Sequence, residues 1–311
     1  MSEREIVCEE LGTALDALRG QGLRLDLIYP ADDPHTAVLS NGDETVRLTS
    51  RPGGAELTDA LPPFAPEFVL TRAGSSAGEG RAGMVYRDLI PSRLGGRYIA
   101  SHITIPGGGP VGDWVHFHRI ALQLLYVRRG WVRVVYQDQG EPFEMREGDL
   151  VLQPPGLRHQ VLESSAEFEI VEISAPAVHA TYADHRMQLP NGSNHGGIYG
   201  GQRFLRHIAV ETPWTPVNGG DAQETRIGVA TSGLAEVRTL RTRNGESLTF
   251  GGHGGELVFG FVLDGSAMLD YRGLNEIGPA DAFVIPPGQP WRLTHPSPEF
   301  RLLHVTTEPL D

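Results

Sequence analysis

The chain has 311 residues and a formal net charge of −13. It is long enough for one large domain or two of ordinary size, and its acidic balance argues against a nucleic-acid partner, whose phosphates require a basic surface. All 26 basic residues are arginine. The absence of lysine excludes Schiff-base catalysis through a lysine amine and a P-loop lysine.

The sequence contains no apolar run long enough to span a membrane. Its first ten residues, MSEREIVCEE, are charged and lack the apolar core of a secretion signal. We therefore expect a cytoplasmic protein with no membrane partner. The single cysteine, Cys8, excludes an internal disulfide and is expected to be inert.

The first sixty residues predict a small α/β arm. Residues 4–19 carry apolar side chains at helical spacing and predict a short helix. Residues 23–30, LRLDLIYP, alternate like a strand, and residues 41–50 predict a turn followed by another strand. Residues 60–83 are rich in proline, glycine and small side chains, which is typical of a linker.

From about residue 84 onward, short alternating segments are separated by glycine and proline, which favours an antiparallel sandwich or barrel. This pattern occurs twice. LLYVRRGWVRVVYQ aligns with FGFVLDGSAMLDYR, and GDLVLQPPGLRH aligns with ADAFVIPPGQPW. A repeat of this size predicts two copies of one β-domain. We place the arm at residues 1–60, the first barrel at 61–185 and the second at 186–311.

Two histidine-containing motifs lie in the first copy. The first motif reads His116-x-His118-x4-Gln123 and continues to Gly130; the second runs from Gly148 through Pro154 and Gly156 to His159. The pair resembles the two signature motifs of the cupin family, in which HxH, a glutamate and a later histidine hold one metal ion in a small barrel. The resemblance implies an all-β fold of two cupin-type double-stranded β-helix (jelly-roll) barrels behind the α/β arm.

Strand geometry supports the same ligand set. Residues i and i+2 of a strand point to the same side, so His116 and His118 point together. Gln123 begins the next apolar strand, and His159 follows a Pro-Gly turn. Three imidazoles and one side-chain oxygen suit a divalent transition metal: Fe(II) is favoured, and Zn, Mn or Ni also fit.

Other interpretations of these residues stay open. An isolated HxH is usually surface decoration, and only the second motif favours a metal site. Gln123 stands where the family has glutamate, and it is either a ligand or a polar group that orients water or a neighbouring histidine. Four neutral ligands would leave the charge of the ion uncompensated, which favours anionic, chelating substrates.

The second copy lacks the ligand set. Gly251, His253, Val258 and Trp291 fall at the four ligand positions. Because one ligand cannot hold an ion, we expect this barrel to be degenerate and structural.

The strand that precedes the first motif, RYIASHITIP, offers candidate catalytic groups. If the face that carries Tyr98 and His102 lines the barrel, these side chains are candidates for general acid/base catalysis; the alternative is a half-exposed sheet face. Arg97 and Arg128 are candidates for binding a substrate carboxylate, with surface arginines as the alternative.

Four further histidines lie between the copies. Their wide spacing fits no compact chelate, so we expect an irregular interdomain loop, which could serve as a lid. The residues are His179, His185, His195 and His207.

The leading hypothesis is a metal-dependent bicupin dioxygenase acting on a small anionic, chelating substrate such as a phenolic acid, a diol or an enolate. One alternative is a redox-neutral isomerase, lyase or cyclase that uses the ion as a Lewis acid. Another is a non-catalytic small-molecule binder. The resemblance also implies a homodimer.

Overall fold

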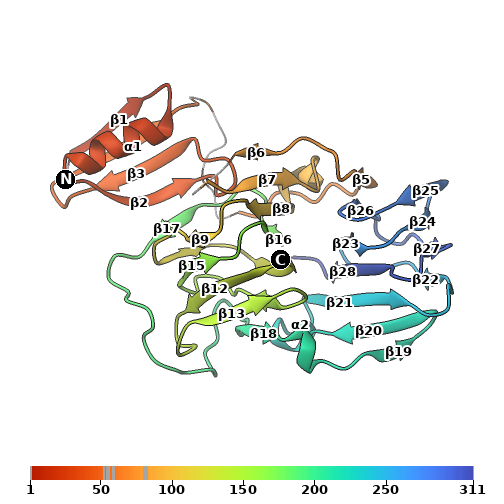
Figure 1. The fold of residues 1–311 in the computed structure, drawn as a ribbon. Helices are drawn as coiled ribbons and strands as arrows, with labels where there is room; N and C mark the ends of the chain where they lie inside the picture. Colours follow the sequence, from red (N-terminus) through yellow and green to blue (C-terminus); the bar gives the residue numbers. More distant parts are fainter. Residues whose placement is uncertain (1, 52, 54–56, 58–59, 80–82, 311) are drawn as a thin grey trace.

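The computed structural model describes residues 2–51, 53, 57, 60–79 and 83–310. Residues 80–82 of the predicted linker, and 52, 54–56 and 58–59 of the predicted arm, lie outside the described residues. The chain forms two β-barrels side by side, with a small α/β arm at one end of the first barrel (Figure 1). This confirms the predicted all-β fold of two jelly-roll barrels behind an α/β arm.

The arm contains one helix against a small sheet. Its elements are β1 (Ser2–Val7), α1 (Leu11–Gly20), β2 (Arg24–Tyr29), β3 (Thr36–Ser40) and β4 (Glu44–Thr49). The helix predicted over residues 4–19 begins only at Leu11, after Glu10 caps it by accepting a hydrogen bond from the backbone N–H of Thr13 at 3.0 Å. The residues before it form β1, which pairs in parallel with β4.

The first barrel consists of two facing sheets. The first sheet contains, in order, β18 (Leu205–His207), β14 (Leu150–Leu152), β11 (Leu122–Arg129), β16 (Phe168–Ala175), β8 (Ile99–Ile105), β7 (Val85–Asp88) and β6 (Gly78–Glu79). The second contains β17 (Thr181–Ala183), β10 (His116–His118), β15 (His159–Ser164), β12 (Trp131–Tyr136) and β13 (Phe143–Arg146), with β9 (Gly109–Pro110) beside β15. Because β17 also pairs with β2, the second sheet continues into the arm.

The second barrel has the same two-sheet plan. One sheet contains β19 (Thr215–Val217), β20 (Gly220–Glu224), β21 (Ala235–Thr242), β28 (Arg301–Thr307), β23 (Leu257–Asp264), β26 (Ala282–Val284) and β5 (Val69–Thr71). The other contains β22 (Leu248–Phe250), β27 (Trp291–Thr294), β24 (Ala267–Asp270) and β25 (Leu274–Ile277). Short helical turns lie outside the sheets: η2 (Arg93–Gly96), η3 (Ala209–Glu211) and α2 (Ile227–Ala230).

The sequence repeat is also a repeat of backbone conformation. Gly130 and Gly265 both have positive φ, 79° and 67°, and Gly156 and Gly288 both have φ of 74°. Side chains other than glycine rarely adopt this conformation. The repeated glycines therefore mark the same turns in both barrels.

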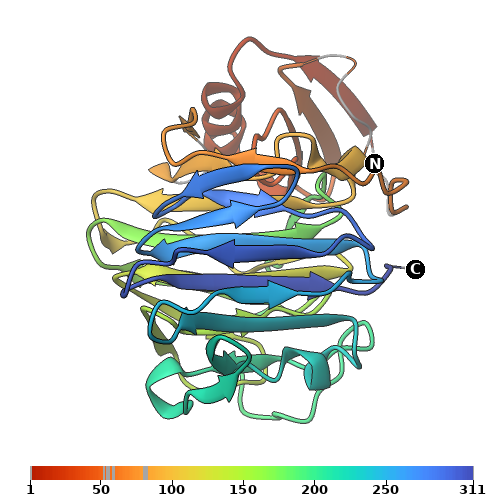
Figure 2. The same cartoon turned by 90° about the vertical axis from the view of Figure 1, so that its right-hand side faces the viewer.

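The barrels contact each other through a sheet of each. Strands β8, β11 and β16 of the first barrel and β21, β23 and β28 of the second contribute to one shared apolar cluster. Two strands pair across the predicted domain boundaries: β5 joins β26 of the second barrel, and β18 joins β14 of the first. Figure 2 shows the orange segment that contains β5 beside the blue strands. The boundaries at residues 60/61 and 185/186 stay predictions.

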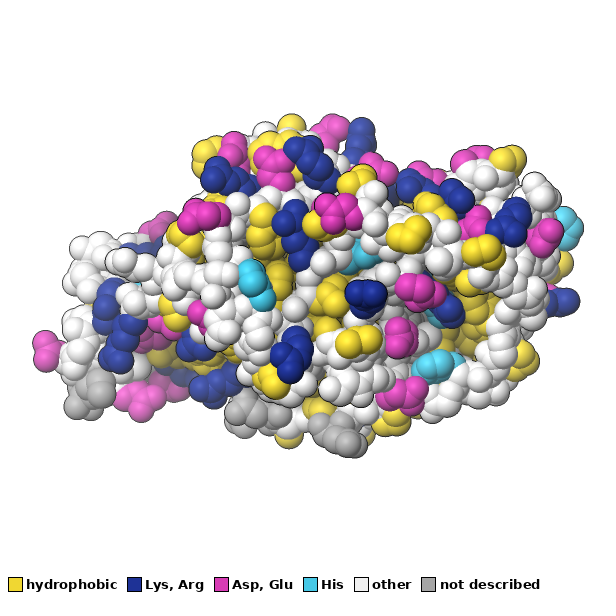
Figure 3. Space-filling model, turned by 90° about the horizontal axis from the view of Figure 1, so that it is seen from below, with side chains coloured by type: hydrophobic (Ala, Val, Ile, Leu, Met, Phe, Trp, Pro, Cys, Tyr) yellow, Lys and Arg dark blue, Asp and Glu magenta, His cyan; other side chains and the backbone are white. Residues whose placement is uncertain are grey.

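The surface carries mixed charge. On the face shown in Figure 3, arginine side chains and carboxylates are interspersed rather than gathered by sign. In the part of the chain that the structure describes, no helix is both long and apolar enough to cross a membrane.

Candidate metal centre

Strand β10 directs His116 and His118 into the first barrel. Between them, Phe117 points outward and stacks on Tyr182 with ring centroids 5.2 Å apart. The guanidinium of Arg158 covers the Phe117 ring at 4.2 Å. Because side chains alternate along a strand, this outer packing holds both histidines on the inner side, where they are buried.

His159 joins them from the neighbouring strand. It begins β15 and lies directly opposite His116 in the antiparallel register. One ring nitrogen from each of His116, His118 and His159 lies within 4.8 Å of the others. Among the described residues, this is the one cluster of histidine, cysteine or carboxylate side chains with the spacing of a metal site. The structure thus brings His159 together with two histidines that are far from it in the sequence.

Backbone carbonyls orient all three rings. Each Nδ1 lies within hydrogen-bond distance of a backbone oxygen, which can only accept, so Nδ1 carries the proton and Nε2 presents its lone pair. The accepting oxygens belong to Trp114, Ala180 and Leu157, at 2.7, 3.2 and 3.0 Å from His116, His118 and His159 in turn. This is the tautomer that metal coordination through Nε2 requires.

Gln123 points to the same place as His159. Its Oε1 accepts a hydrogen bond from Nε2 of Gln153 at 2.7 Å, and that nitrogen also lies 3.0 Å from Nε2 of His159. Tyr136 donates its hydroxyl proton to Oε1 of Gln153 at 3.1 Å. Burial raises the pKa of Tyr136, so the hydroxyl keeps that proton. Three imidazole nitrogens with an amide oxygen nearby form a donor set that fits a divalent transition ion.

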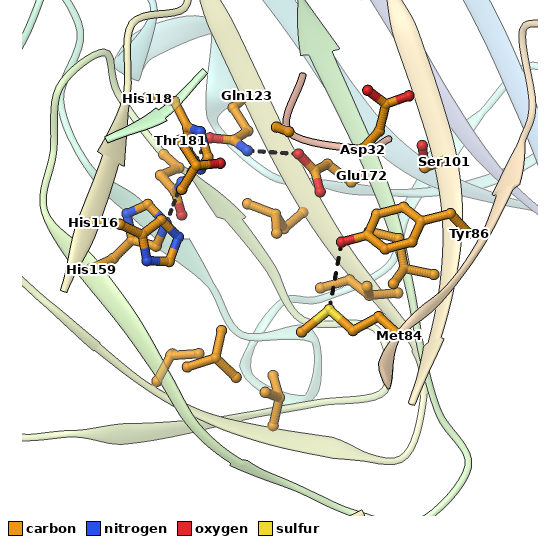
Figure 4. Close-up of a pocket in the computed structure, with 18 of the residues that line it drawn as sticks. Asp32, Met84, Tyr86, Ser101, His116, His118, Gln123, His159, Glu172 and Thr181 are labelled. Carbon is orange, nitrogen blue, oxygen red and sulfur yellow. Dashed lines mark hydrogen bonds between the residues drawn. The ribbon is translucent and has the colours of Figure 1, made fainter. Parts of the chain in front are cut away.

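A carboxylate stands beside Gln123. Nε2 of Gln123 donates to Oε1 of Glu172 at 2.6 Å (Figure 4), and the hydroxyl of Ser174 donates to the same oxygen at 3.0 Å. Glu172 also lines the cavity that contains the histidines. The expectation of a site without protein negative charge is therefore corrected: the four candidate ligands are neutral, but an anionic group is hydrogen-bonded to one of them.

The histidines lie at one side of a cavity of about 110 Å³ inside the first barrel. Away from them its wall is mainly apolar, as the unlabelled side chains of Figure 4 illustrate. The apolar lining includes Leu125, Val132, Val134, Met145, Phe168 and Ile170. The arm contributes Ala31 and Asp32 to the wall. The charged side chains among the described lining residues are Asp32 and Glu172, both acidic.

Two further buried polar side chains, His179 and Thr181, lie near His118 at the same side of the cavity. Thr181 lies opposite His118 in the strand register, and the His179 ring is 5.3 Å from the His118 ring. Nδ1 of His179 bonds to the carbonyl oxygen of Pro176 at 3.0 Å. In the described part of the chain, His179 Nε2 and Thr181 Oγ1 have no hydrogen-bond partner. Of the four histidines predicted to lie in an interdomain loop, His179 alone lines the cavity.

Tyr98 and His102 lie away from the three histidines. The Tyr98 hydroxyl donates to Glu256 at 3.0 Å, and the His102 ring lies 5.6 Å from the Phe261 ring of the second barrel. The opposite face of β8 lines the cavity, through Ile99, Ser101, Ile103 and Ile105. The assumption that the face carrying Tyr98 and His102 lines the barrel is therefore wrong, because this face meets the second barrel. Their catalytic role stays a prediction.

The two candidate substrate arginines are also occupied elsewhere. Arg97 forms an ion pair with Glu256 of the second barrel, with Nη2 and Oε1 2.8 Å apart. Arg128 pairs with Glu169. Neither arginine lines the cavity.

At the equivalent place in the second barrel, the four aligned positions line a pocket that contains two stacked aromatic rings. Trp291, at the position of His159, stacks on Phe250 with centroids 3.8 Å apart. His253 accepts a hydrogen bond from the backbone N–H of Gly255 at 2.9 Å. That the second barrel is degenerate and structural stays a prediction.

Sequence reasoning missed Gln153 and Glu172, and it assigned His179 to a loop. Glu172 had a detectable signal, because it shares one face of β16 with Phe168 and Ile170, and a carboxylate on an apolar strand face is unusual. Gln153 and His179 lie outside strands and carry no comparable periodic signal.

Residues 101–174, which hold all four candidate ligands, match the sequence family described as "Cupin domain". This part of the chain is a cupin domain. No curated protein matches it. Solved structures with a similar fold include a variant of Bacillus subtilis oxalate decarboxylase, with 12% identity and a TM-score of 0.58 over 80% of this chain and 79% of that one. Protein Ylba from E. coli has 13% identity and a TM-score of 0.57, covering 82% and 94%.

A third similar structure is the formate complex of Lactobacillus farciminis oxalate decarboxylase. Its identity to this chain is 11% and its TM-score is 0.57, covering 81% of this chain and 88% of that one. At these identities the likeness concerns the fold alone.

Proposed function

We propose that this cupin is a metal-dependent enzyme that binds one divalent transition ion through His116, His118, His159 and Gln123. The observation that carries the proposal is the tautomer arrangement: three buried imidazoles are tied by Nδ1 to backbone oxygens and direct Nε2 into one cavity. A structural role for these rings alone would not require three lone pairs at one point.

The proposed reaction is oxygenation of a small chelating substrate such as an enolate, a diol or a phenolic compound. A bound ion such as Fe(II) would supply Lewis acidity and electron transfer toward dioxygen. The protein would contribute the closed apolar wall, which excludes water, and Glu172, which could accept a proton from the substrate head group. The carboxylate also orients Gln123 through its 2.6 Å hydrogen bond.

A redox-neutral reaction is the second candidate. The presence of a carboxylate in the cavity favours it, because isomerases and lyases move a proton between substrate carbon and a protein group. Two of the solved structures with a similar fold are named as decarboxylases.

Elemental analysis of protein purified without added metal tests the centre itself. We expect about one transition ion per chain, and its loss in His118→Ala. His185→Ala is the matched control, because His185 is part-exposed and bonds to the Leu25 carbonyl away from the cavity. Metal retained equally in both variants would contradict the proposal.

Oxygen uptake then distinguishes the two reactions. The iron-loaded protein is assayed with catechols, hydroxy-aromatic acids and β-diketones. Uptake that depends on His118 supports oxygenation. Product formation under anaerobic conditions with Zn(II) supports the redox-neutral candidate instead.

A further inference from the structure

The cavity beside the proposed metal centre is divided into a polar end and an apolar wall. The polar end contains the three histidines, Gln123 and Glu172, and the wall comes from strands of both facing sheets. Figure 4 shows the histidines and Gln123 at one side of the cavity; the remaining wall is mainly apolar and also carries Asp32, Tyr86 and Ser101. A ligand that fills the cavity must therefore present two different surfaces.

The charge of the cavity limits which polar head group a ligand can present to the metal centre. Its charged lining residues within the described chain are Asp32 and Glu172, and no arginine lines it. A substrate with two carboxylates would, together with Glu172, bring three negative charges to one divalent ion, so one of these charges would have no cationic partner. Buried charge without a partner is strongly unfavourable. A dicarboxylate such as oxalate is thus a poor match for this cavity.

The two unpartnered polar atoms define the head further. His179 is 5% exposed and Thr181 is fully buried. Because Nδ1 of His179 donates to the Pro176 carbonyl, its Nε2 is an acceptor. This nitrogen can accept a hydrogen bond from an O–H or N–H group of a ligand. The Thr181 hydroxyl can donate a hydrogen bond to a ligand oxygen. Buried polar atoms without partners are rare and require an explanation.

The volume agrees with a short apolar body. A cavity of about 110 Å³ is somewhat smaller than an engineered apolar cavity of about 150 Å³ that binds benzene. We infer that the substrate is amphiphilic, with a singly charged or neutral chelating head of the enol, phenol or hydroxamate type and an apolar body against the wall. This inference rests on the proposed metal centre and narrows its substrate class.

A series of alkyl hydroxamates tests the inference with the zinc-loaded protein, because their head is constant and their tail varies. Isothermal titration calorimetry would compare acetohydroxamate, butanohydroxamate, hexanohydroxamate and oxalate. Burial of each added methylene should tighten binding about threefold to fourfold until the wall is filled. Oxalate should bind more weakly than hexanohydroxamate.

Two substitutions test separately how the chelating head and the apolar body of the ligand contribute to binding. Val134→Thr keeps the shape of a wall residue but adds a hydroxyl, so it should weaken hexanohydroxamate more than acetohydroxamate. Val135→Thr is the matched control, because Val135 is the next residue of β12 and does not line the cavity. Thr181→Val should weaken both hydroxamates alike, by about twofold to tenfold.

The outcomes distinguish this inference from the proposed function. Zinc binding with no dependence on tail length, or with oxalate binding more tightly than hexanohydroxamate, overturns the inference and leaves the metal centre intact. Failure of the protein to bind any transition ion overturns both. The series on the unsubstituted protein decides the matter even if a variant fails to fold.

Discussion

The side-chain nitrogen Nε2 of Gln153 lies 3.0 Å from Nε2 of His159. It is the only amide in the described chain found at hydrogen-bond distance from both a candidate histidine ligand and Gln123 Oε1, which is 2.7 Å away. The N–H groups of Gln153 therefore occupy the lone pairs that a cation would use. An ion held by His159 would have to replace this hydrogen bond.

We predict that Gln153→Leu tightens metal binding. The substitution removes a competing hydrogen bond at His159, and a hydrogen bond of this kind contributes about 0.5–1.5 kcal/mol, or twofold to tenfold in affinity. Competition with a metallochromic indicator would measure the dissociation constant for Zn(II). Gln139→Leu, in a half-buried turn away from the cavity, is the control. Weakening of tenfold or more would mean instead that Gln153 supplies a ligand atom.

Glu172 leads to a second prediction. Glu172→Gln keeps an oxygen that can accept from Gln123 but removes the negative charge beside the donor set. Partners that orient metal ligands typically contribute tenfold to a hundredfold in metal affinity, so we expect a loss of about tenfold. Glu169→Gln is the matched control on the same strand, because Glu169 pairs with Arg128 and does not line the cavity. Equal affinity in the two variants would remove the electrostatic role assigned to Glu172.

The meeting of the three candidate histidine ligands could be predicted from the sequence, because short local patterns set where each side chain points. Period-two alternation places His116 and His118 on one side of a strand, and the Pro-Gly turn with Gly156 at positive φ sets the start of the strand at His159. The repeat could be predicted for the same reason, because its glycines lie in turns whose backbone conformation few other residues can adopt.

The faces of β8 could not be predicted from the same pattern. Both faces of this strand are buried, one by the cavity and the other by the second barrel, so alternation does not distinguish them. The choice depends on how the two barrels dock, a contact between residues such as Tyr98 and Glu256 that are far apart in the sequence. His179 was missed for a similar reason: it reaches the cavity only because the chain after β16 returns along β10.

The contact between the barrels yields a stability prediction. Arg97 and Glu256 form a bidentate ion pair, with side chains 9% and 11% exposed, and Tyr98 donates to the same carboxylate. Removing one partner of a buried pair leaves the other charge uncompensated. We expect Glu256→Gln to lower the free energy of unfolding by about 3–5 kcal/mol, measured by urea denaturation.

An exposed pair supplies the comparison. Arg292 and Asp270 form an ion pair with the arginine side chain 57% exposed, and Asp270→Asn should change the free energy of unfolding by less than about 1 kcal/mol. Similar losses of stability in Asp270→Asn and Glu256→Gln would show that the buried inter-barrel ion pair contributes no more to stability than an exposed pair. Metal content should be unchanged in both variants, because neither carboxylate lines the cavity.

The burial of His304 leads to a prediction of how the stability of the second barrel depends on pH. Its ring is buried against Phe250, and burial, with positive charge on Arg238 and His253, lowers its pKa from 6.5 to about 3. Between these values the unfolded chain binds a proton that the folded protein does not. Stability is therefore retained above pH 6.5 and falls as the pH is lowered toward 3, by about 1.4 kcal/mol per pH unit.

We therefore expect His304→Asn to reduce this acid sensitivity. Between pH 7.5 and pH 5, the drop in the free energy of unfolding should be smaller than that of the unsubstituted protein by about 2 kcal/mol. Urea denaturation at the two pH values measures the difference, and His295→Asn is the control because His295 is exposed. Packing lost in the asparagine variant lowers its stability equally at both pH values, so this loss cancels in the difference. If His304→Asn and His295→Asn lose the same stability on acidification, burial of a neutral His304 is not what makes the second barrel sensitive to acid.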